Sequence, residues 1–235
     1  MPQNPPSFPT SQAIAPLSIG QLPPLPSGQQ LQLETAPIVG RCGLGGRLWP
    51  SACALCRWQR TEPEINGASI LELGAGHGAV GLYAAALGAR RVLLTDAYSS
   101  QALLDLARRN VASNLRAGTI PRNVVDVQVL RWGEDALDFE SAPDFVLAAD
   151  VIYNRRAHAA LCSTLASLLG GGVPTRAVLA HEHRGWRRWR RLRDSRIVSF
   201  ERTAAASGLR LTTLSTEHQS KFGLRDVSIL EVAPA

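Results

Sequence analysis

The sequence is poor in lysine, in cysteine and in long apolar runs. Its one lysine, Lys221, stands against 24 arginines, an imbalance that we assign to codon bias before function. The chain contains no run of about 18 apolar residues, so we expect no transmembrane helix and no membrane partner. Its four scattered cysteines argue against a disulfide scaffold and fit a reducing compartment. We therefore expect a cytoplasmic or nuclear protein, or one found in both places.

Charge is missing from the first 33 residues, where no Asp, Glu, Lys or Arg precedes Glu34. This segment is rich in Pro, Ser and Gln, and such a composition cannot bury enough apolar surface to offset the entropy lost on ordering. It also lacks the features of transit and signal peptides. The sequence predicts a disordered tail over residues 1–33 and one folded domain over residues 34–235.

Beyond the tail, short β-branched or Leu-rich runs alternate with helical patterns, which is typical of βαβ units. The runs predict strands at Ser69–Leu73, Arg91–Thr95, Val125–Leu130, Asp144–Ala148, Ala177–Ala180, Leu209–Ser215 and Val227–Val232. The helical patterns fall at Ala52–Arg60, Ala79–Leu87, Ser99–Leu115, Arg156–Leu169 and Arg196–Ala206. The predicted fold class is α/β: a Rossmann-like, doubly wound, seven-stranded, mostly parallel sheet with an antiparallel edge hairpin and helices on both faces.

The stretch SILELGAGHG, from Ser69 to Gly78, places a glycine loop between a buried strand and a helix. Such a loop presents backbone N–H groups at a helix N-terminus, where a ligand can approach closely. The next predicted strand ends in Asp96, 20 residues after Gly76, and an acid there can bind the two hydroxyls of a ribose. These features predict a site for a nucleoside-containing cofactor.

Glu72 makes the cofactor more specific, because it lies two residues before the first glycine of the loop. A carboxylate there repels a pyrophosphate and favours a cofactor with a cationic end, such as the amino group and sulfonium of S-adenosylmethionine. Alternatively, Glu72 accepts backbone hydrogen bonds and braces the loop, and the two roles can coexist.

Four motifs occur in order along the chain: LELGAGHGAVGLYAAALGA, LLTDAY, LRWGE and LAADVIY. The ordered set resembles the class I (seven-β-strand) methyltransferases and, more narrowly, methyltransferase family 16, the lysine methyltransferase-like branch. The resemblance runs from about Gly45 to the C-terminus. It implies S-adenosyl-L-methionine as cofactor and a protein lysine side chain as acceptor.

The resemblance implies further cofactor-binding residues in addition to Glu72. It assigns this role to Trp49 in GRLWP, to Gly74, Ala75 and Gly76 in the loop, to Asp96, to Trp132 in RWG, and to Ala149. For Trp49 and Trp132 the alternative is ordinary core packing, since aromatic residues are usually buried.

Asp150 and Tyr153 are the catalytic candidates, at the end of the strand DFVLAAD and shortly after it. Ligands of open parallel sheets bind outside the carboxyl ends of the strands, so Asp150 belongs in the site. We expect the two side chains to orient the acceptor amine. Alternatively, Asp150 caps the following helix and Tyr153 packs against the core.

No metal site is predicted. His181 and His183 share one face of a strand end, but a metal centre needs more ligands; they are expected to form ordinary hydrogen bonds in a polar loop or to contact substrate. Cys53 and Cys56 form a CxxC without a second pair, and we expect them to be small core residues rather than redox or metal groups.

Seven arginines and one aspartate lie between Arg184 and Arg196 and account for the whole net charge of +6. Trp186, Trp189 and Leu192 recur every three residues there, so the segment can form a helix with an arginine face. It can be a solvated face, a dock for an acidic protein substrate, or, less favoured, a nucleic-acid site. The protein is expected to be a monomer.

Two alternatives to lysine methylation stay open. The same fold can methylate a protein histidine, a nucleic acid or a small molecule. The chain can also be a non-catalytic cofactor-binding protein whose partner contacts matter more than catalysis.

Overall fold

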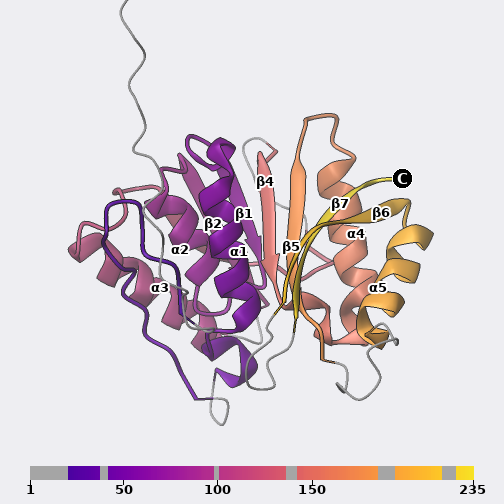
Figure 1. Cartoon of the computed structure of the whole chain (residues 1–235), viewed down its shortest axis with the longest axis horizontal. Helices are drawn as coiled ribbons and strands as arrows, with labels where there is room; N and C mark the ends of the chain where they lie inside the picture. The colour runs from indigo at the N-terminus through magenta and orange to yellow at the C-terminus, as the bar shows by residue number, and fades with distance from the viewer. Residues whose placement is uncertain (1–20, 38–41, 98–100, 136–141, 185–193, 219–225) are drawn as a thin grey trace, which may run out of the picture.

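The computed structural model describes residues 21–37, 42–97, 101–135, 142–184, 194–218 and 226–235. Seven strands form one sheet in the order β3-β2-β1-β4-β5-β7-β6 (Figure 1). The strands are β1 (Ser69–Leu73), β2 (Arg91–Asp96), β3 (Val125–Val129), β4 (Phe145–Ala149), β5 (Arg176–Glu182), β6 (Leu209–Glu217) and β7 (Val227–Pro234). The first five are parallel, whereas β7 pairs antiparallel with both β5 and β6. The predicted fold class is confirmed.

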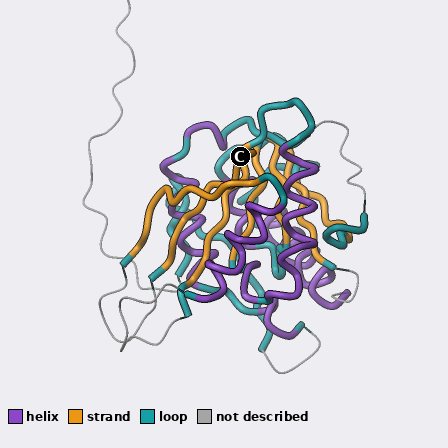
Figure 2. Tube along the Cα trace, turned by 90° about the vertical axis from the view of Figure 1, so that its right-hand side faces the viewer, coloured by secondary structure: helices purple, strands orange, loops and turns teal. Residues whose placement is uncertain are grey.

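Within the described residues five α-helices flank this sheet, and Figure 2 shows helices packed beside the strands. They are α1 (Pro50–Thr61), α2 (Ala79–Ala86), α3 (Gln101–Arg116), α4 (His158–Leu169) and α5 (Ser195–Ala206). Every predicted helix and strand end lies within two residues of the observed end, apart from the start of α3, where Ser99 and Ser100 lie outside the described residues.

Two hydrophobic clusters cover the two faces of the sheet. The cluster of α1, α2 and α3 includes Ile70 of β1, and the cluster of α4 and α5 includes the next residue, Leu71. This alternation follows from the period of two in a strand, and because both faces are covered, β1 is buried at every position. Glu72 shares the face of Ile70 and therefore points toward α2.

Parallel order places the carboxyl ends of β1, β2, β4 and β5 along one edge of the sheet. The strand order reverses between β1 and β4, which pair parallel although two helices and two strands separate them in the sequence. Ligands of open α/β sheets bind at such a reversal point. The fold therefore brings the ends of β1 and β4 together at one location.

Residues 21–33 differ from the expectation of a disordered tail. Leu25 is buried, and Leu22, Leu31 and Leu33 pack against the cluster of α1, α2 and α3. The amide N–H of Gln32 donates to Asn114 Oδ1 on α3 at 3.0 Å. Apolar contacts and side-chain acceptors of the domain thus hold a segment that lacks charge and periodicity. The prediction for residues 1–20 lies outside the described residues.

None of the helices in the described ranges combines the length and the apolar character needed to span a bilayer.

Leu25→Ala tests whether the segment before residue 34 contributes to the core. The change removes buried apolar volume, so the free energy of unfolding should fall by about 2–3 kcal/mol in urea denaturation. Leu214→Ala is the matched control, because Leu214 is 39% exposed on β6 and should change stability by less than about 0.5 kcal/mol. Equal effects of the two changes would contradict the core assignment of Leu25.

Candidate active site

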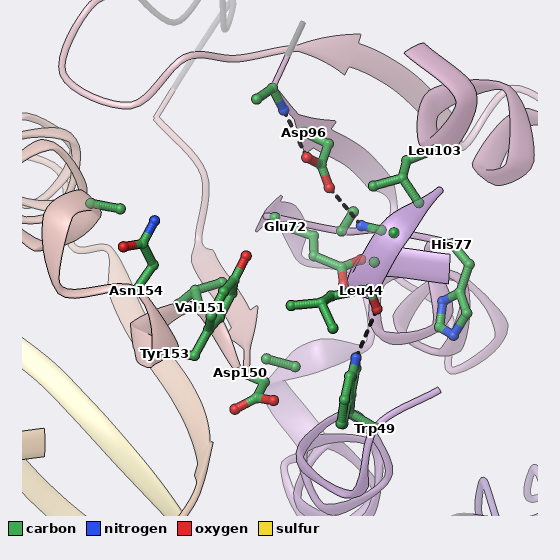
Figure 3. A pocket seen from close by; sticks show the side chains of 18 of the residues that line it. Leu44, Trp49, Glu72, His77, Asp96, Leu103, Asp150, Val151, Tyr153 and Asn154 are labelled. Carbon is green, nitrogen blue, oxygen red and sulfur yellow. Dashed lines mark hydrogen bonds between the residues drawn. The ribbon is translucent and has the colours of Figure 1, made fainter. Parts of the chain in front are cut away.

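A cavity of about 710 Å³ opens where the ends of β1, β2 and β4 meet (Figure 3). Its size suits a small organic ligand. All ten residues that the sequence assigned to the site line it: Trp49, Glu72, Gly74, Ala75, Gly76, Asp96, Trp132, Ala149, Asp150 and Tyr153. The structure thus brings the ten together, and their chemical roles stay predictions.

Glu72 lies in the wall of this cavity with only 2% of its surface exposed. Its Oε2 accepts the backbone N–H of Gly81, in the first turn of α2, at 2.7 Å, so the bracing role is present. Burial raises the pKa of Glu72 to about 8, the Gly81 hydrogen bond lowers it, and the nearby Asp96 adds a smaller increase. A cation bound beside this carboxyl would favour its ionised form.

The glycine loop is fixed by backbone contacts on both sides. Gly74 and Gly76 have φ angles of +66° and +56°, which favour glycine. A Cβ on Gly76 would lie 2.4 Å from the carbonyl oxygen of Gly45, so a neighbouring backbone, and not only a ligand, explains the missing side chain. Asp96 Oδ2 accepts the Gly76 N–H at 2.9 Å and ties the loop to the end of β2.

Two half-buried tryptophans border the cavity. Trp49 precedes α1, and its Nε1 donates to the carbonyl of Leu44 at 2.9 Å (Figure 3). Trp132 packs against the cluster of α4 and α5 and approaches Gly74, where its Cζ2 would lie 3.3 Å from an added Cβ. One part of each ring therefore packs against the protein, and the remainder lines the cavity.

Asp150 follows β4 in a left-handed conformation, with φ of +57°, and is 6% exposed. Its N–H donates to the carbonyl of Ala180 on β5, which fixes the turn. The side chain makes no capping hydrogen bond to the 3-10 helix Val151–Tyr153, so the capping alternative is wrong. A non-glycine residue held at positive φ at the edge of a cavity is the kind of strain found at functional sites.

Arg184 is the site residue that sequence reasoning missed. Its guanidinium pairs with Asp150 Oδ2, lies 4.9 Å from the centre of the Trp49 ring, and approaches Glu182. Burial raises the pKa of Asp150, and the Arg184 charge opposes that shift. Arg184 also lines the cavity, so a cationic group that binds to Asp150 would lie beside the Arg184 guanidinium.

Tyr153 is 43% exposed and lines the cavity, so the alternative that it packs in the core is wrong. Partial burial, with the negative charges of Asp96 and Asp150, raises the pKa of its hydroxyl. The hydroxyl therefore stays a hydrogen-bond donor at neutral pH.

His77, in the middle of the glycine loop, is a second residue without a predicted role. It is 3% exposed, and burial lowers its pKa to about 4, so the ring is neutral. Neither ring nitrogen has a hydrogen-bond partner within the described ranges.

His181 and His183 end up close to Asp194, with one candidate ligand atom of each within 4.8 Å of the others. These atoms are already occupied by hydrogen bonds. His181 Nε2 is 3.2 Å from Asp194 Oδ2, and His183 Nε2 is 2.7 Å from the Ser228 hydroxyl. The expected hydrogen bonds are present, but His181 lies fully buried on β5 and not in a polar loop, and the absence of a metal stays a prediction.

Cys53 and Cys56 are buried in α1, as expected of small core residues. Burial raises the pKa of the Cys53 thiol to about 11, which keeps it protonated. Of the Arg184 to Arg196 segment, residues 185–193 lie outside the described residues.

The profile of the lysine methyltransferase family, Methyltransf_16, matches residues 28–195 of the chain. The chain belongs to this family. The resemblance drawn from the ordered motifs is thereby confirmed.

Two curated relatives illustrate the match to the lysine methyltransferase family. Mouse EEF1A lysine methyltransferase 3 is 32% identical over 168 residues, which cover 70% of this chain and 68% of the relative. Protein N-lysine methyltransferase METTL21A of Xenopus tropicalis is 38% identical over 112 residues, 47% of this chain and 49% of the relative. The chain thus spans about half the length of the METTL21A relative that it matches.

Solved structures agree in fold. The glycopeptide N-methyltransferase MtfA aligns with a TM-score of 0.59 at 14% identity, over 78% of this chain and 90% of that one. Magnesium protoporphyrin IX methyltransferase from Synechocystis, with bound SAH, aligns with a TM-score of 0.55 at 16% identity, over 78% of this chain and 82% of that one. At these identities the likeness concerns the fold alone.

Glu72→Gln should change how stability depends on pH. A buried group whose pKa is raised favours folding while it is protonated, so its contribution is full below pH 4.5 and is lost as the pH rises through about 8. The variant should therefore be more stable than the wild type at pH 9, by on the order of a few kcal/mol, and similar to it near pH 4.5.

Urea denaturation at the two pH values measures this difference. Glu134→Gln is the control, because Glu134 also lines the cavity while its side chain is 64% exposed. A parallel pH dependence of wild type and Glu72→Gln would contradict the raised pKa.

The Asp150–Arg184 pair should show strong energetic coupling. Asn tolerates positive φ, so Asp150→Asn removes the charge with little backbone strain. Combined with Arg184→Gln in a double-mutant cycle, it should give a coupling energy of about 1–3 kcal/mol in urea denaturation. The same cycle on the exposed pair Arg109–Glu34, whose side chains are 54% and 55% exposed, should give less than about 1 kcal/mol. A coupling energy no larger than that of the control pair would contradict a strong interaction between Asp150 and Arg184.

Proposed function

We propose that the chain is an S-adenosyl-L-methionine-dependent methyltransferase that transfers a methyl group to a lysine side chain of a protein. The observation that carries this is the buried Glu72 in the wall of a cavity whose other walls are a glycine loop, Asp96 and two tryptophans. The cofactor supplies an electrophilic methyl group when bound. The names of the two curated relatives support a protein lysine as the acceptor.

In this proposal each wall of the cavity has a separate task. Glu72 faces the cationic end of the cofactor, Asp96 binds the ribose hydroxyls, and Trp132 lies beside the adenine. Methyl transfer is an in-line displacement, so the main contribution of the protein is to hold donor and acceptor in line. Asp150 and Tyr153 orient the acceptor nitrogen at the other end of the cavity.

A protein substrate with an acidic surface fits the arginine-rich segment between Arg184 and Arg196, whose charge is +6. Opposite charges at long range favour encounter of the two proteins. We further propose that the protein acts as a monomer in the cytoplasm, the nucleus or both. Four free cysteines, two of them buried in α1, support a reducing compartment.

Cofactor binding should release protons. At pH 7 Glu72 is mostly protonated, because its pKa is about 8, and a cofactor ammonium placed beside it requires the ionised form. Calorimetry with S-adenosylhomocysteine in two buffers of different ionisation enthalpy should detect proton release at pH 7. Glu72→Gln should release none and bind more weakly, whereas Asp126→Asn, at an exposed position on β3 that does not line the cavity, should match the wild type. Binding of NAD instead of S-adenosylhomocysteine would overturn the cofactor assignment.

Methyl transfer is tested with radiolabelled cofactor and a cell extract. Label in the extract should be lost on protease treatment and kept on nuclease treatment, and amino-acid analysis should recover methyllysine. The Lys221→Arg variant serves as the enzyme, because it removes the one lysine of the chain and therefore any lysine self-methylation. Methylhistidine or labelled nucleic acid would point to the alternative acceptors.

Asp150→Asn in the same assay should reduce turnover by on the order of 100-fold, because the acceptor amine loses its charged partner. Asp126→Asn makes the same chemical change at an exposed position on β3 and should leave turnover unchanged. Full activity of Asp150→Asn would remove Asp150 from the mechanism.

A further inference from the structure

His181 is a fully buried histidine between two aspartates from distant parts of the chain. It lies on β5, with 0% of its surface exposed. Its Nε2 is 3.2 Å from Asp194 Oδ2, and its Nδ1 is 4.0 Å from Asp150 Oδ1. Asp194 precedes α5 and Asp150 follows β4, so the histidine connects the catalytic candidate to a helix N-terminus.

Asp194 determines which ring nitrogen carries the proton. Its Oδ2 also accepts the N–H of Arg184 at 2.8 Å, and its Oδ1 accepts the N–H of Arg196 at 2.9 Å. These donors and His181 hold the pKa of Asp194 well below its usual range, against the opposing effect of burial. An ionised carboxylate can only accept, so His181 Nε2 must be the donor.

If the ring is neutral, the lone pair of His181 Nδ1 faces a lone pair of Asp150 Oδ1 at 4.0 Å. Both atoms are buried, and neither has a hydrogen-bond partner among the described residues. Two buried acceptors that face each other are unfavourable, and a proton on either atom could be shared once the two side chains approach from 4.0 Å to hydrogen-bond distance. In this geometry Asp150 Oδ1 and His181 Nδ1 can together act as a base that accepts one proton.

Other charged and titratable groups around this pair come from two places, the end of β5 and the start of α5. They are Arg184 and Glu182 at the end of β5, His183 with its ring centre 5.2 Å from that of His181, Arg196 on α5, and Asp194. Arg184 occupies the other oxygen of Asp150, so Oδ1 is the oxygen that remains available for a proton.

We propose that His181 is a positioning residue for Asp150: held at Nε2 by Asp194, it completes with Asp150 a unit that takes up one proton from the acceptor. The part that concerns the acceptor rests on the proposed function. The acceptor ammonium gives up one proton, directly or through one water, and the electron pair of that N–H bond stays on the nitrogen. The proton becomes bonded to Asp150 Oδ1 or to His181 Nδ1, and it leaves to solvent after the product departs.

The proton position is tested without any substrate, by ¹⁵N NMR of the histidine-labelled full chain at pH 7. His181, assigned with His181→Gln, should carry its proton on Nε2. Asp150→Asn should shift the Nδ1 signal, because the new amide can donate to it, while Asp126→Asn should not. A neutral ring protonated at Nδ1, or an Nδ1 signal indifferent to Asp150→Asn, would overturn the proposal.

The rate of methyl transfer to the extract protein that becomes labelled supplies the second readout. His181→Gln places an amide near the former Nε2, so it can still donate to Asp194 but lacks the base that faces Asp150. It should lower kcat by on the order of 10-fold or more and move the acid limb of the kcat–pH profile to lower pH, with S-adenosylhomocysteine affinity unchanged. His183→Gln, the same change two residues away, should leave the profile in place.

An acid limb that stays where it is in His181→Gln would contradict the proposal, even if the rate falls, because a purely structural role lowers the rate without moving the limb. If the wild type transfers no methyl group, the proposed function fails, and the NMR experiment still decides whether Asp150 and His181 face each other as acceptors.

Discussion

Burial of carboxyl groups at one edge of a parallel sheet is the constraint on which this site depends. Asp150 shares its charge with Arg184, and Asp96 accepts the amide of Gly76. Glu72 differs, because among the described residues its carboxyl accepts a hydrogen bond from the backbone amide of Gly81 and has no cationic partner, and burial dominates its pKa. Of these three acids, Glu72 therefore gains most from a ligand that brings its own positive charge.

The same constraint divides the cavity into two ends with different chemistry. Near β1 and β2, an acid and a tight glycine loop offer a place for the charged and hydroxyl groups of a small molecule. Near β4 and β5, Asp150 lies beside a histidine and pairs with an arginine that in turn lies over the Trp49 ring. One end is organised mainly by backbone amides and the other by side chains, so the second can change with less effect on the fold.

Local sequence patterns predicted the secondary structure. Strand and helix bounds followed from periodicity, and the ten site residues came together because parallel strands end at one edge. The Asp150–Arg184 pair was not predicted, because Arg184 was counted with the arginine-rich segment that follows β5, and its sequence pattern does not show that its side chain turns back to the end of β4. Residues 21–33 were misassigned because their scattered leucines show no helix or strand period, although Leu25 reaches the core.

The position of β7 has a consequence for biosynthesis. This strand follows every other element in the sequence, yet it lies between β5 and β6 and pairs with His181 through Ser228. On the ribosome, a nascent chain that ends before β7 exposes the unpaired edge of β5, the strand that carries His181. The end of the cavity near β4 and β5 is thus completed only after β7 has been synthesised, later than the end near β1 and β2.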